Sequence, residues 1–112
     1  MKYIRTKDNI YEECARERCP NGCVITTSGV RVPYTDIIFQ SDRIEDVCDF
    51  IFVKDEYGDY RLYDLKDRNT DKEYLKESWT YGWLKELYYC IKTDKGLIYK
   101  AKMNEKGELE LL

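Results

Sequence analysis

The C-terminal end of the chain carries the pattern that most constrains the fold. Three segments rich in alternating apolar and polar residues follow one another, at residues 88–93, 97–103 and 108–112. The two turns between them each contain a glycine, which adopts the positive φ that tight hairpin turns require, so the series is typical of an antiparallel β-meander. Along the middle segment, Leu97, Tyr99, Ala101 and Met103 share one side of a regular strand. We expect that side to be buried.

Three further hairpins are predicted upstream, because short runs of β-branched and aromatic residues alternate with turn residues. The paired segments are 3–6 with 10–13, 24–27 with 30–39, and 52–54 with 60–63. Pro33 lies inside one of these segments and lacks the amide hydrogen that a central strand donates, so we expect an edge position or a bulge there.

Two helices are predicted between the strands. Ser41 or Asp42 offers an N-cap for the first, at 42–50. One face of that helix would carry Ile44, Val47, Cys48 and Ile51. A second, shorter helix is expected at 73–79. The predicted fold class is α+β: a curved antiparallel sheet of about five to seven strands that ends in a β-meander, with one main amphipathic helix and a second short helix.

Size and charge narrow the class of protein. A chain of 112 residues has the length of one domain, so residues 1–112 are expected to form a single domain. The 22 acidic and 19 basic residues are interleaved, so nucleic acid is not an expected partner. No apolar run is long enough to cross a bilayer, and the first residues lack an apolar signal core. These features predict a cytoplasmic protein with no membrane partner. We expect a monomer or a homodimer, because the exposed edge of the last strand allows pairing with a second copy of the chain.

The chain contains no histidine, which removes the Ser-His and Cys-His nucleophile pairs and the commonest zinc-hydrolase ligand sets. Its six glycines are isolated and form no phosphate-binding loop. Carboxylate pairs are frequent, but acid-base catalysis needs a shifted pKa inside a pocket, which sequence spacing does not show. We therefore predict a non-enzymatic protein, with an enzyme that uses a carboxylate or cysteine active site as an alternative.

The five cysteines are expected to be thiols, because an odd number leaves one unpaired and no export signal is visible. Cys14, Cys19 and Cys23 lie close in sequence, and the turn between the last two could direct both thiolates at one tetrahedral metal ion. A structural zinc would need a fourth ligand, such as Cys48, Cys90 or a carboxylate. No cofactor is predicted. A small structural zinc–thiolate domain and a regulatory disulfide are the alternatives.

Aromatic residues are abundant: eleven tyrosines, two tryptophans and three phenylalanines exceed what one small core easily encloses. The candidate binding residues lie in polar or turn-rich segments and are Tyr57, Tyr60, Tyr63, Tyr81 and Trp83. Tyr and Trp suit a protein interface because they bury a large area at small entropic cost and keep a hydrogen-bonding end. The competing interpretation is that these rings cover a shallow sheet face.

Three parts of the sequence carry a resemblance. They are MKYIRTKD at 1–8 with IYE at 10–12, QSDRIEDVCD at 40–49, and TDKGLIY at 93–99 with AKMNEKGELELL at 101–112. They resemble short uncharacterised proteins of Firmicute bacteria, their prophages and other mobile elements. The resemblance implies a phage or mobile-element accessory protein, without an assigned activity or catalytic residue. Small proteins of such elements often bind and block host proteins, defence systems among them, so by analogy the expected partner is a host protein that this chain modulates or inhibits.

Overall fold

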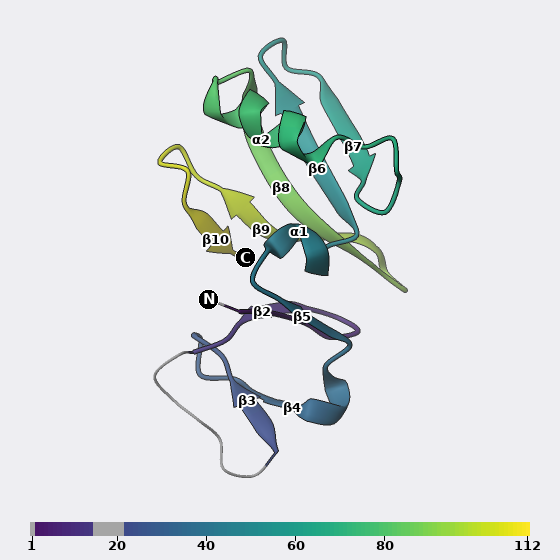
Figure 1. Ribbon diagram of the computed structural model, residues 1–112, viewed down its shortest axis with the longest axis vertical. Coiled ribbons are helices and arrows are strands. Elements are labelled where there is room, and N and C mark those ends of the chain that lie inside the picture. Colours follow the sequence, from purple (N-terminus) through teal and green to yellow (C-terminus); the bar gives the residue numbers. More distant parts are fainter. Residues whose placement is uncertain (1, 15–21) are drawn as a thin grey trace. The chain divides into compact units, whose positions relative to one another are not determined.

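The computed structural model describes residues 2–14 and 22–112 and confirms the α+β fold class. The described residues form ten strands, two α-helices and one short 3-10 helix, and the strands make three separate antiparallel sheets. The chain divides into two compact units, Met1–Val47 (unit 1) and Cys48–Leu112 (unit 2) (Figure 1). The single domain over 1–112 stays a prediction. In the described part of the chain, no helix is both long enough and apolar enough to cross a membrane.

Unit 1 consists of short strands in two small sheets. The strands are β1 (Tyr3–Arg5), β2 (Ile10–Glu12), β3 (Cys23–Ile25), β4 (Arg31–Pro33) and β5 (Phe39–Ser41). β1 lies between β2 and β5, and β3 pairs with β4. The predicted first hairpin is confirmed, and Pro33 ends an edge strand as expected. The second hairpin is shorter than predicted, because the 3-10 helix η1 (Tyr34–Asp36) ends it and Phe39 pairs with Arg5 instead.

The predicted main helix at 42–50 is wrong in length. α1 spans only Ile44–Val47, and strand β6 (Phe50–Asp55) takes up the last residue of the predicted helix. The physical reason lies in the next residues: Ile51 and Val53 are buried while Phe52 between them is half-buried, which is the period of a strand. β-Branched side chains at those two positions also favour a strand.

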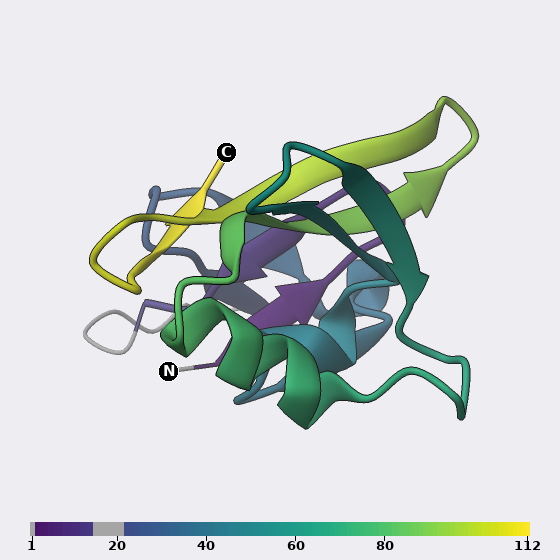
Figure 2. The same ribbon diagram turned by 90° about the horizontal axis from the view of Figure 1, so that it is seen from above.

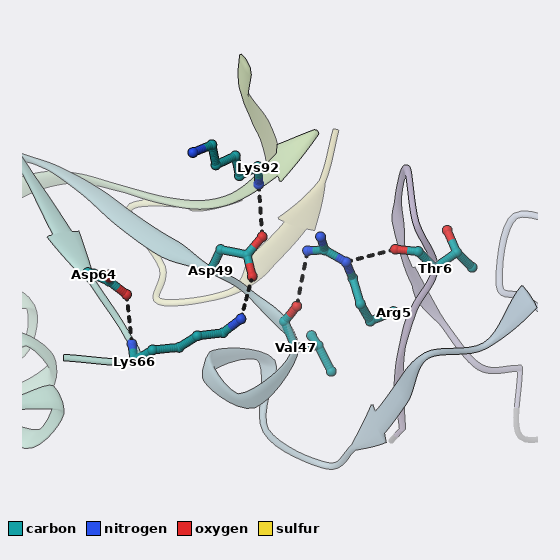
Figure 3. A network of polar contacts seen from close by, with 7 residues as sticks. All are labelled: Arg5, Thr6, Val47, Asp49, Asp64, Lys66 and Lys92. Carbon is teal, nitrogen blue, oxygen red and sulfur yellow. Dashed lines mark hydrogen bonds and ion pairs between the residues drawn. The ribbon is translucent and has the colours of Figure 1, made fainter. Parts of the chain in front are cut away.

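Polar contacts hold both ends of α1. The Ser41 hydroxyl accepts a hydrogen bond from the Arg43 amide at 3.1 Å just before the helix, but α1 begins at Ile44, so the prediction of Ser41 or Asp42 as its N-cap is wrong by one or two residues. At the other end, the Arg5 guanidinium donates to the Val47 carbonyl at 3.3 Å and to the Thr6 carbonyl at 2.7 Å (Figure 3). A cation at a helix C-terminus satisfies a carbonyl that has no partner within the helix.

Unit 2 is one antiparallel sheet in the strand order β10-β9-β8-β6-β7, with one helix. Besides β6, its elements are β7 (Tyr60–Asp64), α2 (Lys72–Thr80), β8 (Leu84–Thr93), β9 (Gly96–Met103) and β10 (Leu109–Leu111). The third predicted hairpin is confirmed as β6 and β7, and the predicted meander as β8, β9 and β10. The turn glycines Gly58, Gly96 and Gly107 all have positive φ, as a tight turn requires.

One face of this sheet, the inner face, forms the core of unit 2. Its buried side chains are Ile51, Val53, Leu87, Tyr89, Ile91 and Ala101. Helix α2 runs along one side of the sheet (Figures 1 and 2) and contributes the buried Leu75. The Asp71 carboxylate accepts a hydrogen bond from the Tyr74 amide at 3.0 Å and caps the helix. The helix is slightly longer than the predicted 73–79.

A carboxylate fixes the ends of three strands in unit 2. Asp49, directly before β6, accepts a hydrogen bond from the Lys92 amide at 2.9 Å and lies 3.4 Å from the Lys66 ammonium (Figure 3). The Lys66 amide in turn donates to the Asp64 carboxylate at 2.9 Å, at the end of β7. These contacts join the start of β6 to the ends of β7 and β8.

Candidate functional site

Four aromatic rings form a continuous cluster on the face of the unit 2 sheet opposite the inner face. We call this cluster the outer aromatic face; it comprises Phe52 on β6, Tyr60 on β7, Tyr88 on β8 and Tyr99 on β9. The Phe52 ring stacks on Tyr60 with centroids 5.1 Å apart, and it lies 5.3 Å from Tyr99 and 6.2 Å from Tyr88. Tyr88 and Tyr99 are 5.5 Å apart. The cluster therefore crosses four neighbouring strands.

A β-bulge places Tyr99 in this cluster. Tyr89 pairs with Ala101, but the next residue of β8, Cys90, pairs with Tyr99, so Lys100 is an extra residue in β9. The prediction that Leu97 and Tyr99 are buried with Ala101 is therefore wrong: they are 40% and 43% exposed. Side chains alternate between the two faces along a regular strand. The extra residue therefore places Leu97 and Tyr99, which precede it, on the face opposite Ala101.

The outer aromatic face is open to solvent. Tyr60 is 54% exposed, and Leu62, which pairs with Phe52 across the hairpin, is 45% exposed. Lysine ammonium groups lie over two of the rings, with Lys54 Nζ 5.4 Å from the Tyr60 centroid and Lys102 Nζ 5.6 Å from the Tyr88 centroid. Both distances are within cation–π range.

Tyr88 is held by a hydrogen bond as well as by its ring contacts. Its hydroxyl donates a hydrogen bond to the Glu86 carboxylate at 3.2 Å. Burial and the nearby Glu86 raise the pKa of Tyr88, with burial the larger cause, and Lys102 partly opposes the shift. The phenol therefore stays neutral at physiological pH and keeps its hydrogen.

The buried Cys90 lies on the same strand as Tyr88. Its thiol lies 3.7 Å from the Tyr88 carbonyl, and burial raises the pKa of Cys90 to about 11. A thiol with that pKa is almost fully protonated at pH 7, whereas a cysteine nucleophile reacts as the thiolate. Cys90 is therefore a poor candidate for the cysteine active site that we kept as an alternative.

A second feature, which we call the α2 cleft, lies between the β6–β7 hairpin and helix α2. It has a volume of about 390 Å³. Its aromatic lining comes from Tyr57, Tyr63, Tyr74 and Trp83. Its charged lining comes from Asp55, Glu56, Asp59 and Arg61, three carboxylates and one guanidinium, which leaves a formal charge of −2.

Hairpin geometry gathers these charges. Asp55 Oδ1 accepts hydrogen bonds from the Tyr57 and Asp59 amides, both at 3.0 Å, so the Asp55 carboxylate holds the turn that carries the other acidic groups. Interaction with the Tyr63 hydroxyl is the largest cause that raises the pKa of Arg61, followed by the charges of Asp55 and Asp59. Arg61 thus stays positively charged at the cleft.

Ser78 also lines the α2 cleft, and its hydroxyl has no hydrogen-bond partner. The residue is only 2% exposed and lies on α2 one turn after Leu75, on the side of the helix that faces the sheet. A buried polar group without a partner costs about 1–3 kcal/mol, and such exceptions in native proteins need an explanation.

Four of the five predicted binding residues fall on these two surfaces. Tyr60 belongs to the outer aromatic face, whereas Tyr57, Tyr63 and Trp83 line the α2 cleft. Tyr81 lies beside the cleft, with its ring 5.7 Å from that of Trp83. Their role in binding stays a prediction.

Sequence reasoning did not select the other members of either surface. They are Phe52, Tyr88 and Tyr99 on the outer aromatic face, and Tyr74, Arg61 and Ser78 in the cleft. Tyr88 stands in a polar context and could have been added by the criterion used for Tyr60. Phe52 and Tyr99 could not have been selected in this way, because strand register and the β-bulge determine on which face of the sheet these two rings lie.

The predicted cysteine cluster is changed by a disulfide. Cys23 is disulfide-bonded, which corrects the expectation that all five cysteines are thiols, and a sulfur in a disulfide is not a thiolate ligand. Cys14 is a half-buried free thiol, and Cys19 lies outside the described residues. Cys48 is buried in the core, as expected. Within residues 2–14 and 22–112, no three cysteine, aspartate or glutamate side chains come together as a metal-binding group.

Comparison of the chain with protein-family models, with curated proteins and with solved structures gives no match.

Proposed function

We propose that this protein is a non-enzymatic accessory protein of a phage or other mobile element, which binds a host protein and modulates or inhibits it. Host defence systems are the first partners to test. The observation that supports binding is the outer aromatic face, where four rings form one connected cluster on a solvent-exposed sheet face. Exposed aromatic clusters of this kind typically mark interaction sites.

The arrangement of the rings suits a protein interface. Each ring is already in contact with at least one other ring. These side chains would therefore lose little conformational freedom when a partner binds. Affinity is gained mainly when such ordering costs are small. The tyrosine hydroxyls add hydrogen-bonding groups at the edge of an apolar surface, as in protein interfaces.

Charge around the rings favours a protein over a single-stranded nucleic acid. By register, three lysines share this face with the rings: Lys54, Lys92 and Lys102. Three carboxylates also share it: Asp64, Glu86 and Glu110. The six charges sum to zero, whereas a stacking platform for nucleic acid needs a positive groove along the phosphate backbone.

Affinity capture from a Firmicute lysate tests the proposal. The tagged protein is compared with a Tyr60→Ala, Tyr99→Ala double variant, and co-purifying proteins are identified by mass spectrometry. The matched control is Tyr34→Ala with Phe39→Ala, which removes two exposed rings from unit 1. Thermal unfolding shows that each variant is folded. We expect one host protein to be enriched by the wild type and the control, and its affinity for the double variant to fall at least about tenfold.

Three outcomes contradict parts of the proposal. A partner retained equally by the double variant would place the interface away from the outer aromatic face. Binding of a single-stranded oligonucleotide that the double variant loses would replace the protein partner with nucleic acid. Self-association that depends on the same two tyrosines, measured by light scattering, would make a second copy of the chain the occupant of this surface.

A further inference from the structure

The α2 cleft combines features that point to one class of ligand. Its lining carries three carboxylates and one guanidinium, so two negative charges are uncompensated. The guanidinium of Arg61 already interacts with the Tyr63 hydroxyl and with the carboxylates of Asp55 and Asp59. A positively charged group entering the cleft meets a favourable field, and an anionic group meets an unfavourable one.

The aromatic walls favour an organic cation over a metal ion. Four rings, those of Tyr57, Tyr63, Tyr74 and Trp83, line the same cleft as the carboxylates. The face of an aromatic ring attracts ammonium groups, and cages of tyrosine and tryptophan with nearby carboxylates are a common way to bind them. A divalent metal instead needs several oxygen ligands at one point, and the described residues of the cleft do not converge in that way.

Ser78 supplies an independent reason to expect a ligand. Ser78 lines the cleft, and its buried hydroxyl has no hydrogen-bond partner. A hydroxyl oxygen accepts a hydrogen bond from an ammonium N–H, which would satisfy this oxygen. One ammonium group can therefore supply both the hydrogen-bond donor that Ser78 lacks and a positive charge that compensates the carboxylates.

We infer that the α2 cleft binds an alkylammonium group, with the rings around its methylenes and head, the hairpin carboxylates balancing its charge and Ser78 accepting one of its hydrogens. The identity of this group rests on the proposed function: if the protein binds a host protein, the alkylammonium group is a lysine side chain of that partner. The cleft would then recognise one basic residue of a partner whose main contact is elsewhere.

The test is an NMR titration of the isolated protein with Nα-acetyl-lysine N-methylamide, which needs no identified partner. Nα-acetyl-norleucine N-methylamide is the neutral probe of nearly the same shape. We expect the lysine probe to shift the Trp83 indole and Ser78 amide signals saturably, with a Kd of roughly millimolar size, because one exposed ammonium contact is weak. The norleucine probe should bind at least about tenfold more weakly.

Variants locate the site. Glu56→Gln with Asp59→Asn removes two hairpin carboxylates and should weaken lysine binding about tenfold. Its matched control, Glu108→Gln with Glu110→Gln, removes the same charge at the β10 edge and should leave binding unchanged. Ser78→Ala should weaken binding about threefold. Raising the salt concentration should weaken wild-type binding, because Glu56 and Asp59 are exposed.

The outcomes separate this inference from the proposed function. No saturable shift with the lysine probe, or equal binding of the norleucine probe, overturns the ammonium site even if a host protein is captured. Binding of the lysine probe without any captured partner supports the ammonium site and overturns its assignment to a protein lysine.

Discussion

The two faces of the unit 2 sheet come from alternate residues of the same strands, yet they differ in burial: the inner face is largely buried, whereas the outer-face residues other than the buried Cys90 are half-buried or exposed. In β6, Ile51 and Val53 lie on the inner face, and Phe52 and Lys54 lie on the outer face. The outer face is as rich in aromatic rings as the inner one, but α2 packs on the inner side, against β8. Apolar character therefore does not decide which face is buried here. The packing of α2 contributes to the burial of the inner face, and the aromatic residues of the other face stay accessible to solvent.

The largest expected effect compares one leucine from each face. Leu87→Ala removes an inner-face side chain that is 2% exposed, and should lower the free energy of unfolding by about 2–5 kcal/mol. Leu62→Ala makes the same chemical change on the outer face, where the side chain is already half in water, and should cost less than about 1 kcal/mol. Urea unfolding of both variants measures the difference. Equal costs would mean that the outer face is covered in solution.

The second effect is a loss of stability at high pH. Burial raises the pKa of Cys90 from 9.0 to about 11, so the folded protein binds this proton more tightly than the unfolded chain. The stabilising contribution is complete below pH 9 and is lost as the pH rises from 9 to 11, by about 2 kcal/mol. Unfolding curves at several pH values measure this loss.

Cys90→Ala is the control for that measurement. Tyr88 also has a raised pKa and adds its own loss of stability above pH 10, but both proteins contain it. The difference between wild type and Cys90→Ala therefore isolates the thiol. If the two curves run parallel from pH 8 to pH 11, Cys90 titrates at its ordinary pKa and is accessible to water.

The third effect is a gain in stability at the α2 cleft. Ser78→Ala removes a buried hydroxyl that lacks a partner, and alanine has the higher helix propensity, so the isolated protein should become more stable by about 1 kcal/mol. Thermal unfolding checks it. Thr80→Ala on the same helix is the control, because the Thr80 hydroxyl donates to the Lys76 carbonyl at 3.0 Å. A destabilised Ser78→Ala variant would show that the hydroxyl has a partner in solution.

The strands of unit 2 were predictable because their signals are local. Glycines such as Gly96 and Gly107 stand where φ is positive, and β-branched and aromatic residues lie between the turns. The helix at 42–50 failed because Ile44, Val47 and Ile51 fit a helical period as well, while Ile51 in fact alternates with half-buried neighbours in β6. Local pattern alone could not choose between the two periods.

The two aromatic surfaces were predictable only in part. Polarity of context selected Tyr60 for the outer aromatic face and Trp83 for the cleft, but it could not show that they lie on different surfaces. That separation depends on cross-strand register and on the extra residue Lys100, which are properties of strand pairing rather than of any single segment. Ser78 gave no signal, because one small polar residue in a helix fits many environments.

The smallest expected effect concerns the lysines over the rings. Lys54 lies over Tyr60, and an exposed cation–π contact contributes about 0.5–1 kcal/mol. A double-mutant cycle of Lys54→Met and Tyr60→Leu should therefore give a coupling energy of about 0.5 kcal/mol, since methionine keeps the apolar stem and loses the charge. Urea unfolding of the four proteins measures it, and Lys102→Met with Tyr60→Leu is the uncoupled control, because Lys102 lies over Tyr88. A coupling of zero would mean that the Lys54 ammonium stays in water and that the Tyr60 ring is uncovered before a partner arrives. A measurable coupling would mean that a partner must displace the lysine, so binding to the outer aromatic face should strengthen in the Lys54→Met variant.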